Sequence, residues 1–519
     1  MTSLKYYFFC FLVLLSNKIF SQNFTGIGLS NYGGTYATSL NPANVVDTRT
    51  KVFVNLAGLD AHLTNNYAAW NAPFSFIDMV AKKVPATYLK PNGNVNWLPN
   101  YAEANTNVKN ISAFFSTTIK GPSIQFESKK YKMGFAVGYN NKTLASITNA
   151  SEMIGDMILN GTSNPTKIGP FYTNNHLKFN AVNYNEYYAS LGYIINQSDE
   201  HFIKAGVTLK MLSSNLNLLA DATQLDYVIG YNPSNPSKQD IYMAVTKGSY
   251  AAAQSADFAL SSSWITKQLT SFKGVGNGFG ADLGVVYEFR PNYDKFDYRE
   301  KGILKYDPTV NKYQYKVGFS LIDIGKIVYK DNVNVNAASI NSTANTIDHT
   351  SFDGVNTPNE FNTAMTNVYA LSAASVNHKY SVFLPASAVI NADLAVTKNF
   401  FFGFLLKQSI PLSKSYIFRT PSRLTILPRY ERKWFEVALP VVVDNNYKNV
   451  SFGAYARVGG LFVGSDNLGG LLNIAKPRGL DIYGGLFIPI FYKQPQTITD
   501  CPSTDYSPKK KGFSRKRKR

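Results

Sequence analysis

The sequence predicts an all-β protein: a transmembrane antiparallel β-barrel of about 12–14 strands, with an N-terminal plug segment and long extracellular loops. Three observations predict this class. Apolar and polar residues alternate over runs long enough for a tilted membrane-crossing strand, which needs about 9–11 residues. The connections between these runs alternate between long and short. Charged residues form only 16% of the 519 residues, against about 25% in an average soluble protein.

The N-terminus is expected to be a signal peptide, residues 1–21. Lys5 supplies a positive charge, an apolar run extends from Tyr6 to Leu15, and Ser21 is a small residue suited to a cleavage site. The run is too short to cross a bilayer as a helix. Export to the cell envelope excludes nucleic acid as a partner. Cleavage of the signal peptide would remove Cys10 and leave Cys501 as the one remaining cysteine. Neither a disulfide framework nor a cysteine-based metal site is therefore expected.

The clearest alternation extends over residues 279–290. One face carries Phe279, Ala281, Leu283, Val285, Tyr287 and Phe289, and the other carries Gly280, Asp282, Gly284, Val286, Glu288 and Arg290. Residues 131–140, 202–211, 313–321 and 450–459 show the same pattern. A soluble β-sandwich also alternates, but its strands average about 5–6 residues. Glycine on the polar face would leave room inside a crowded lumen, so the apolar faces are predicted to contact lipid.

The spacing of the strands is an independent test of this prediction. The predicted strands are 51–63, 111–128, 131–146, 186–197, 201–215, 279–290, 312–323, 387–397, 400–412, 433–443, 448–458 and 480–491. Long connections, such as 64–110 and 324–386, alternate with short ones, such as 129–130 and 398–399. Bacterial barrels have short periplasmic turns and long outer loops, so both termini are expected in the periplasm. A further hairpin within 216–278, formed by Gln224–Gly230 and Ile241–Lys247, would raise the count to about fourteen.

A resemblance to a known family comes from residues 23–63. This region begins with a glycine-rich segment, which is followed by the triplet Asn41-Pro42-Ala43 and then by a first strand. This organisation resembles the start of long-chain fatty-acid transporter barrels of the FadL/PorV type. The resemblance implies a plug at residues 22–50, a barrel at 51–492 and an appended tail at 493–519.

The C-terminal stretch, residues 464–491, resembles an uncharacterised outer-membrane family of Bacteroidetes that is known only as a domain of unknown function. Many such barrels end on a terminal aromatic residue, whereas this chain continues after its last strand. Phe491 or Tyr492 would take that role internally.

Charged residues on the polar faces are the candidate functional residues of the lumen. They are Lys204, Lys210, Asp282, Glu288, Arg290, Lys316, Asp393 and Arg457. One interpretation is a ladder of mutually neutralising charges that fills a closed interior. The other is a site or path for an anionic group, such as a fatty-acid carboxylate. Because unpaired buried charges are costly, these groups are expected to pair or to be hydrated.

The sequence contains no motif that predicts an enzyme, a metal site or a cofactor. The glycines between Gly274 and Gly280 do not follow the dinucleotide-binding spacing, and no helix pattern follows them. The five histidines lack the spacing of metal ligands. No nucleophile elbow is present.

The chain ends in a basic tail. Its charged residues are Lys509, Lys510, Lys511, Arg515, Lys516, Arg517, Lys518 and Arg519. Eight like charges so close together repel one another, so no packed structure is expected. The tail is expected to lie in the periplasm, where it contacts an anionic surface or an acidic protein partner, or is a solvated extension.

Three functions agree with these features. The first is a channel or transporter for small hydrophobic or amphipathic molecules, in contact with outer-membrane lipid. The second is a structural or accessory barrel of a secretion or gliding apparatus. The third is a secreted soluble β-protein acting as an adhesin. A kinked strand beside an apolar lumen would favour the first, and a plugged lumen with large ordered outer loops would favour the second.

Overall fold

The computed structural model describes residues 24–96, 98–160, 165–198, 200–232, 235–255, 274–300, 303–341, 358–369, 375–412 and 418–495. The predicted signal peptide, residues 1–21, and the basic tail, residues 509–519, lie outside the described residues.

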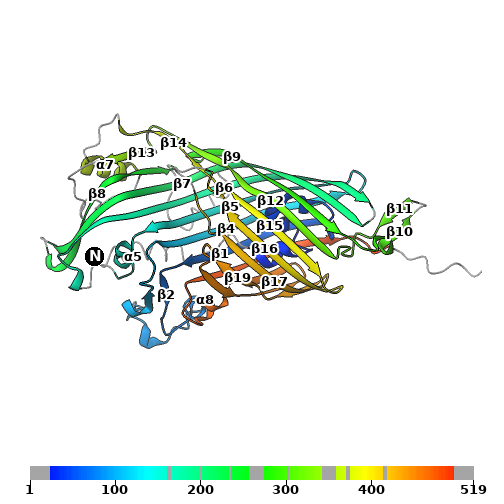
Figure 1. Ribbon diagram of the computed structural model, residues 1–519, viewed down its shortest axis with the longest axis horizontal. Helices are drawn as coiled ribbons and strands as arrows, with labels where there is room; N and C mark the ends of the chain where they lie inside the picture. The colour runs from blue at the N-terminus through cyan, green and yellow to red at the C-terminus, as the bar shows by residue number, and fades with distance from the viewer. Residues whose placement is uncertain are drawn as a thin grey trace, which may run out of the picture.

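Antiparallel strands form a closed barrel, and β1 closes it by pairing with β23 on one side and β4 on the other (Figure 1). Its wall contains 14 crossing strands. Adjacent wall strands are consecutive in the chain, because hairpin connections place each strand beside its predecessor. Two of the 14 crossings are each made of two short strands, β18 with β19 and β20 with β21.

The wall strands are β1 (Thr50–Asn65), β4 (Ile111–Ser128), β5 (Met133–Ala150), β6 (Phe171–Ser198), β7 (His201–Asn232), β9 (Gly276–Phe289), β12 (Tyr315–Lys330), β15 (Ser387–Ala395), β16 (Phe400–Ser409), β17 (Arg423–Glu431), β18 (Phe435–Ala438), β19 (Val441–Asp444), β20 (Asn449–Phe452), β21 (Ala454–Val458), β22 (Leu461–Ser465) and β23 (Gly479–Phe491). The remaining strands are β2 (Ala68–Trp70), β3 (Ala102–Ala104), β8 (Asn235–Gln254), β10 (Asp297–Glu300), β11 (Ile303–Tyr306), β13 (Val335–Asn341) and β14 (Lys379–Phe383).

Helices occur before the barrel and in its loops. The N-terminal segment, defined here as residues 24–49, contains α2 (Thr25–Leu29), α3 (Thr35–Leu40) and the 3-10 helix η2 (Pro42–Val45). The loop helices are α4 (Phe76–Val80), α5 (Glu152–Asn160), α7 (Pro358–Tyr369) and α8 (Leu468–Leu472), with the short 3-10 turns η3 (Ala86–Tyr88), η4 (Pro99–Tyr101), η5 (Pro165–Lys167) and η6 (Tyr293–Phe296). Among the described residues, no helix is long and apolar enough to cross a membrane.

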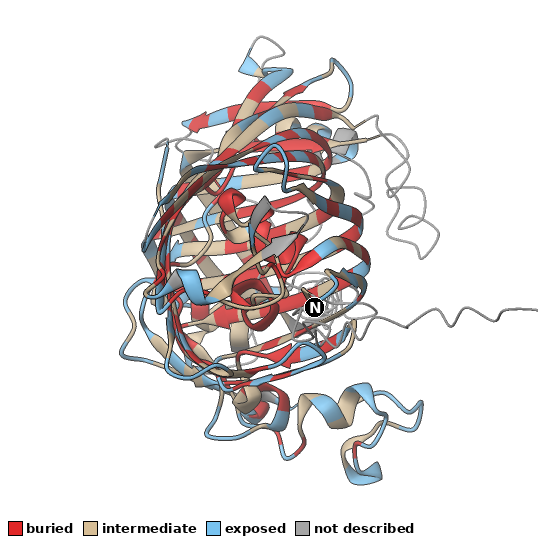
Figure 2. Ribbon diagram, turned by 90° about the vertical axis from the view of Figure 1, so that its right-hand side faces the viewer, coloured by how far each residue is buried: buried red, intermediate tan, exposed pale blue. Residues whose placement is uncertain are grey.

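The predicted alternation of faces is confirmed. On β9, Phe279, Leu283 and Val285 are exposed on the outside, whereas Asp282 and Glu288 are buried. Figure 2, which views the barrel from one end, shows buried and exposed positions alternating along the wall. Apolar groups exposed on the outside of a closed barrel are those of a protein in an outer membrane. This surface argues against the alternative of a soluble secreted β-protein.

One predicted apolar position is wrong. Tyr313 was expected on the outer face of its strand, but β12 begins only at Tyr315. Tyr313 lies before this strand and is buried, and its hydroxyl donates a hydrogen bond to Asp393 Oδ2 at 2.6 Å.

Two strands were missed in the count of twelve, β17 and β22. Pro428 lies within β17, and a proline argues against a strand in a sequence pattern; β22 has only five residues and directly follows two glycines. Because β17 was missed, the alternation of direction was shifted by one, so the predicted strands 433–443 and 448–458 were expected to cross in the wrong direction. The predicted hairpin within 216–278 is present, but it lengthens β7 and adds β8 beyond the wall instead of adding two crossings.

The barrel is extended at the end that carries most of the long loops. The first part of β7 pairs with β9, and its second part pairs with β8, which in turn pairs with β13 (Figure 1). Helix α7 packs on this extension through Met365 and Tyr369. The opposite end has short turns, except for the connection between β9 and β12 that holds β10 and β11.

Candidate functional site

A row of glycines lines the inner wall where η2 lies. Gly134 pairs with Gly192, Gly192 with Gly206, and Gly206 with Gly284, on β5, β6, β7 and β9. A Cβ atom at any of the four would come within 3.0 Å of atoms of residues 41–46. The helix η2 can therefore approach the strand backbones only because these positions have no side chains.

Asn41, Pro42 and Ala43, the predicted plug motif, lie at this contact. The Asn41 side chain accepts a hydrogen bond from Ala43 N at 3.0 Å and so caps η2, and Pro42 takes the first helical position, where no N–H is needed. The side-chain amide of Asn41 also donates, through Nδ2, to the carbonyl oxygens of Val285 and Phe319, at 3.1 and 3.3 Å. Asn41 thus joins the turn to β9 and β12.

Hydrogen bonds hold the rest of the N-terminal segment to widely separated parts of the wall. Ser30 Oγ donates to Glu436 Oε2 at 2.7 Å, and Thr38 Oγ1 donates to Gln125 Oε1 at 3.1 Å. The hydroxyl of Tyr36 donates to Asn55 Oδ1 at 2.6 Å. These acceptors belong to β18, β4 and β1. The segment is therefore enclosed by the wall, and most of its residues are buried.

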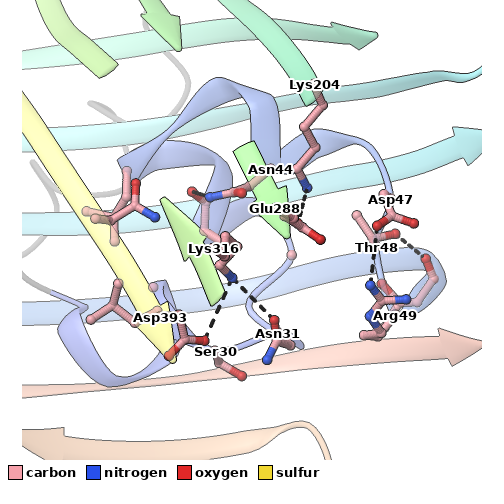
Figure 3. Close-up of a pocket in the computed structure, with 17 residues that line it drawn as sticks. Ser30, Asn31, Asn44, Asp47, Thr48, Arg49, Lys204, Glu288, Lys316 and Asp393 are labelled. Carbon is pink, nitrogen blue, oxygen red and sulfur yellow. Dashed lines mark hydrogen bonds and ion pairs between the residues drawn. The ribbon is translucent and has the colours of Figure 1, made fainter. Parts of the chain in front are cut away.

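A small pocket lies between the N-terminal segment and the wall (Figure 3). Its volume is about 40 Å³, which is space for a few water molecules. Four of the predicted lumen charges line it: Lys204, Glu288, Lys316 and Asp393. They come from β7, β9, β12 and β15. The segment contributes Asn31, Asn44, Asp47 and Arg49 to the lining.

Ion pairs surround this pocket. Arg290 Nη2 lies 2.6 Å from Asp47 Oδ2 and 2.5 Å from Glu288 Oε2. Burial alone would raise the pKa of Asp47, but the neighbouring guanidinium groups of Arg290 and Arg49 hold it well below its usual range. Burial lowers the pKa of the nearby Lys312 to about 7, although Asp47 opposes this shift. Asp47 therefore stays ionised and joins the segment to Arg290, the residue that follows β9.

Arg457, another predicted lumen charge, belongs to an adjoining group of ion pairs. Its Nε lies 3.0 Å from Glu436 Oε2. Arg429 contacts three carboxylates, at 2.8 Å to Asp393, 2.9 Å to Glu431 and 3.5 Å to Glu436. Asp393 therefore links this group to the pocket.

The two remaining predicted charges, Lys210 and Asp282, lie in a separate network. Lys210 Nζ is 2.7 Å from both Asp282 Oδ1 and Asp323 Oδ1. Lys142 lies 2.9 Å from Glu186 and 3.3 Å from Asp323. Two lysines thus face three carboxylates, and none of the five lines the pocket.

A buried histidine was not expected as a site residue. His62 on β1 lies with Nε2 2.7 Å from Asp444 Oδ2 and Nδ1 3.1 Å from Asp481 Oδ2. Its partners lie on β19 and β23, so the contact depends on closure of the barrel. Among the residues that the structure describes, no group of three or more His, Cys, Asp or Glu side chains could hold a metal ion.

Some of the residues that were missed could have been identified from the sequence. Arg423, Thr425, Leu427, Arg429 and Glu431 are buried at alternate positions of β17, a pattern that could have been read across Pro428. Asp47, Arg49 and Asn31 lie in turns of the N-terminal segment, where no periodicity indicates which side chains face the wall.

Solved structures similar to this chain include FadL-type barrels. A FadL homologue from Pseudomonas aeruginosa is 12% identical, with 90% of this chain and 96% of that chain covered and a TM-score of 0.36. The CymD monoaromatic hydrocarbon channel is 9% identical, with 90% and 98% covered and a TM-score of 0.32. The toluene transporter TodX from Pseudomonas putida is 8% identical, with 91% and 98% covered and a TM-score of 0.29. TM-scores of this size indicate only a distant similarity, from which nothing about function follows.

The comparison with curated proteins found no match. A family model matches residues 42–466, which contain the end of the N-terminal segment and the wall from β1 to β22. The matched region ends near the start of the stretch 464–491 on which the resemblance to an uncharacterised family rested. The chain belongs to the family of unknown function DUF5723.

Proposed function

We propose that this outer-membrane barrel transports small hydrophobic or amphipathic molecules, and that its N-terminal segment is a plug that closes the lumen at rest. The observation that carries the proposal is the position of residues 24–49, which are enclosed by the wall and hydrogen-bonded to strands around it. The space that remains at the pocket, about 40 Å³, is too small for such a molecule. Transport therefore requires the segment to move.

The contacts of the segment agree with a plug that can be displaced. Many of them are hydrogen bonds to polar side chains, such as Ser30 to Glu436 and Thr38 to Gln125. Water can replace each partner when the lumen opens, so breaking such a bond costs only about 0.5–1.5 kcal/mol net.

An interruption of the wall suggests a sideways route. The crossing made by β18 and β19 is broken at Leu439 and Pro440, and the next is broken at Gly453. Buried apolar residues lie beside this interruption on the inside, among them Leu427 and Ala438, and they pack with Ile27 and Leu29 of the segment. An amphipathic molecule could place its apolar part there and its polar part near Arg429.

The test is to fix the segment to the wall. Cysteines replace Thr38 and Gln125 in a Cys501→Ser background and are joined by a short thiol-reactive cross-linker with a cleavable disulfide. The variant is reconstituted in vesicles, and uptake of a naphthylamine dye is measured. We expect cross-linking to stop uptake and reduction to restore it. Equal uptake in both states would show that the segment is not a gate.

We also propose that both termini face the periplasm and that residues 509–519 contact an anionic surface or an acidic partner there. The support is the even number of crossings, 14, together with the position of most long loops at the opposite end. Deleting 509–519 should leave insertion intact and reduce salt-sensitive co-purification with cell wall. Loss of insertion would identify the tail as an assembly element.

A second candidate function is an accessory barrel, and the length of β6 and β7 favours it. These strands have 28 and 32 residues, whereas a membrane crossing needs about 9–11. Most of both strands therefore stands outside the membrane, where it could bind a partner of a secretion or gliding apparatus. Cross-linking in intact cells from a cysteine at Thr246 would identify such a partner; if no protein is captured and dye uptake is gated, the transport function stands.

A further inference from the structure

Two lysines at the pocket each have more N–H donors than there are acceptor atoms within hydrogen-bond distance. The side chains of Lys204 and Lys316 are 5% and 11% exposed. Lys204 Nζ donates to Val46 O at 2.9 Å, and Lys316 Nζ donates to Asn31 Oδ1 at 3.3 Å. An ammonium group has three donors. The nearest carboxylates, Glu288 and Asp393, are each 3.9 Å away, beyond hydrogen-bond distance.

Each of these carboxylates already accepts hydrogen bonds from other groups. Arg290 Nε donates to Glu288 Oε2 at 2.9 Å. Asp393 Oδ2 accepts from Arg429 Nη2 at 2.8 Å and from the Tyr313 hydroxyl at 2.6 Å. Guanidinium groups bond carboxylates through several fixed donors, so the two carboxylates are hydrogen-bonded to arginines and not to the lysines. The two ammonium groups are left facing the cavity.

The ion pairs around the pocket carry an excess of positive charge. Within the described part of the chain, contacts of 4.0 Å or less form two separate groups. The first joins four basic side chains with three acidic ones: Arg49, Lys129, Lys204 and Arg290 with Asp47, Glu127 and Glu288. The second is balanced and joins Lys316, Arg429 and Arg457 with Asp393, Glu431 and Glu436. One positive charge of the first group is therefore unbalanced, and one monovalent anion would balance it.

The size of the cavity limits what this anion could be. A volume of about 40 Å³ holds a monatomic anion with a water molecule, since one water needs about 10–15 Å³. It does not hold an acyl chain. Most of the lining is polar, and it contains the side chains of Asn31 and Asn44 (Figure 3).

We propose that this pocket binds one small monovalent anion, of the size of chloride, between the ammonium groups of Lys204 and Lys316. Lys204 also donates to Val46, and Lys316 also donates to Asn31. The anion therefore helps to hold these two parts of the N-terminal segment against β7 and β12. This site goes beyond the proposed transport and does not depend on it, because it requires only the resting arrangement.

The test uses the folded full chain in detergent. The midpoint of heat-induced unfolding is measured in sodium chloride and in sodium gluconate at equal ionic strength, since gluconate is too large for the cavity. Chloride should raise the midpoint by about 2 °C once it is well above its dissociation constant. The variant K204M/K316M should lose this increase. In the matched control, Lys210→Met, a buried lysine of the other network is removed, and the increase should persist.

Crystals grown in bromide give a direct measurement that needs no variant. An anomalous peak between Lys204 Nζ and Lys316 Nζ would support the proposal. A pocket that holds only water in bromide would overturn it, as would equal midpoints in chloride and gluconate. An increase that persists in K204M/K316M would overturn it too. None of these results would bear on dye uptake, so failure of the site and failure of the transport function are distinguishable.

Discussion

The two halves of the barrel wall are built differently. From β1 to β12 each crossing is one continuous strand, with 18 residues in β4 and in β5 and 32 in β7. From β15 to β22 no strand exceeds 10 residues, and β18, β19 and β20 have four each. The long half carries the glycine row that contacts η2. The short half contains Pro428, Pro440 and Gly453 at or beside its interruptions.

This difference suggests different roles. Long strands share many ladder hydrogen bonds, so the long half is a fixed support for η2 and for the extension beyond the membrane. The short half has fewer such bonds at its interruptions, and buried ion pairs around Arg429 connect its strands instead. Any opening of the wall is therefore expected in the short half.

The largest expected effect concerns these ion pairs. Arg429→Met leaves Asp393, Glu431 and Glu436 with too few cations in a buried position, and removal of one partner of a buried pair costs about 3–5 kcal/mol. The free energy of unfolding, from denaturant titration in detergent, should fall by this amount. The exposed Arg478→Met is the control. A loss below 1 kcal/mol at Arg429 would mean that the ion pairs do not stabilise the short half.

The next effect tests the outer face of the long half. Val285 is 40% exposed on β9, and arginine at mid-membrane depth costs about 2–4 kcal/mol. Val285→Arg should therefore destabilise the protein in lipid vesicles. Val333 is also exposed but lies in the turn after β12, so Val333→Arg should be tolerated. Equal tolerance at both positions would contradict a lipid-facing β9.

A smaller effect is expected at the glycine row. Gly206→Ala places a Cβ against the backbone of Pro42, and overpacking of this kind costs about 1–3 kcal/mol. The segment should then be cut faster by an added protease. Gly403→Ala in the short half meets only ordinary contacts and should not change the cleavage rate. Identical rates in both variants would mean that η2 is not held by the row.

The smallest effect compares the two halves during uptake. Val437 pairs with Ala456 in the short half, and Val285 pairs with Phe319 in the long half. A disulfide at each pair is made in a Cys501→Ser background. The clamp at 437 and 456 should lower dye uptake several-fold, and the clamp at 285 and 319 should leave it unchanged. A reverse result would place the opening in the long half.

The same comparison explains what could be predicted from the sequence. In the long half, the bounds of β4 were predicted to the residue and those of β9 to within three residues. On β9 the reason is that Phe279, Leu283 and Val285 alternate with smaller or polar residues without interruption. In the short half, Pro428 concealed β17, and glycines beside β22 concealed that strand. The glycines at 134, 206 and 284 were assigned to the lumen, but their alignment into one row requires the register between strands.

The pairing of charges could not be predicted for a similar reason. Asp47 contacts Arg290, and His62 contacts Asp481, across separations of hundreds of residues. Such contacts exist only when the barrel is closed and the N-terminal segment lies inside it. A pattern of alternating residues shows which side of a strand faces the lumen but not which partner lies opposite.

We propose above all that the N-terminal segment closes the lumen of this barrel. The most direct measurement is ion conductance in a planar lipid bilayer, with the intact mature protein compared with a variant that lacks residues 24–49. The intact protein should conduct almost no current, and the variant should show stable open channels. Heat-modifiability on gels checks that the variant is folded. If the folded variant conducts no more than the intact protein, the segment does not close the barrel.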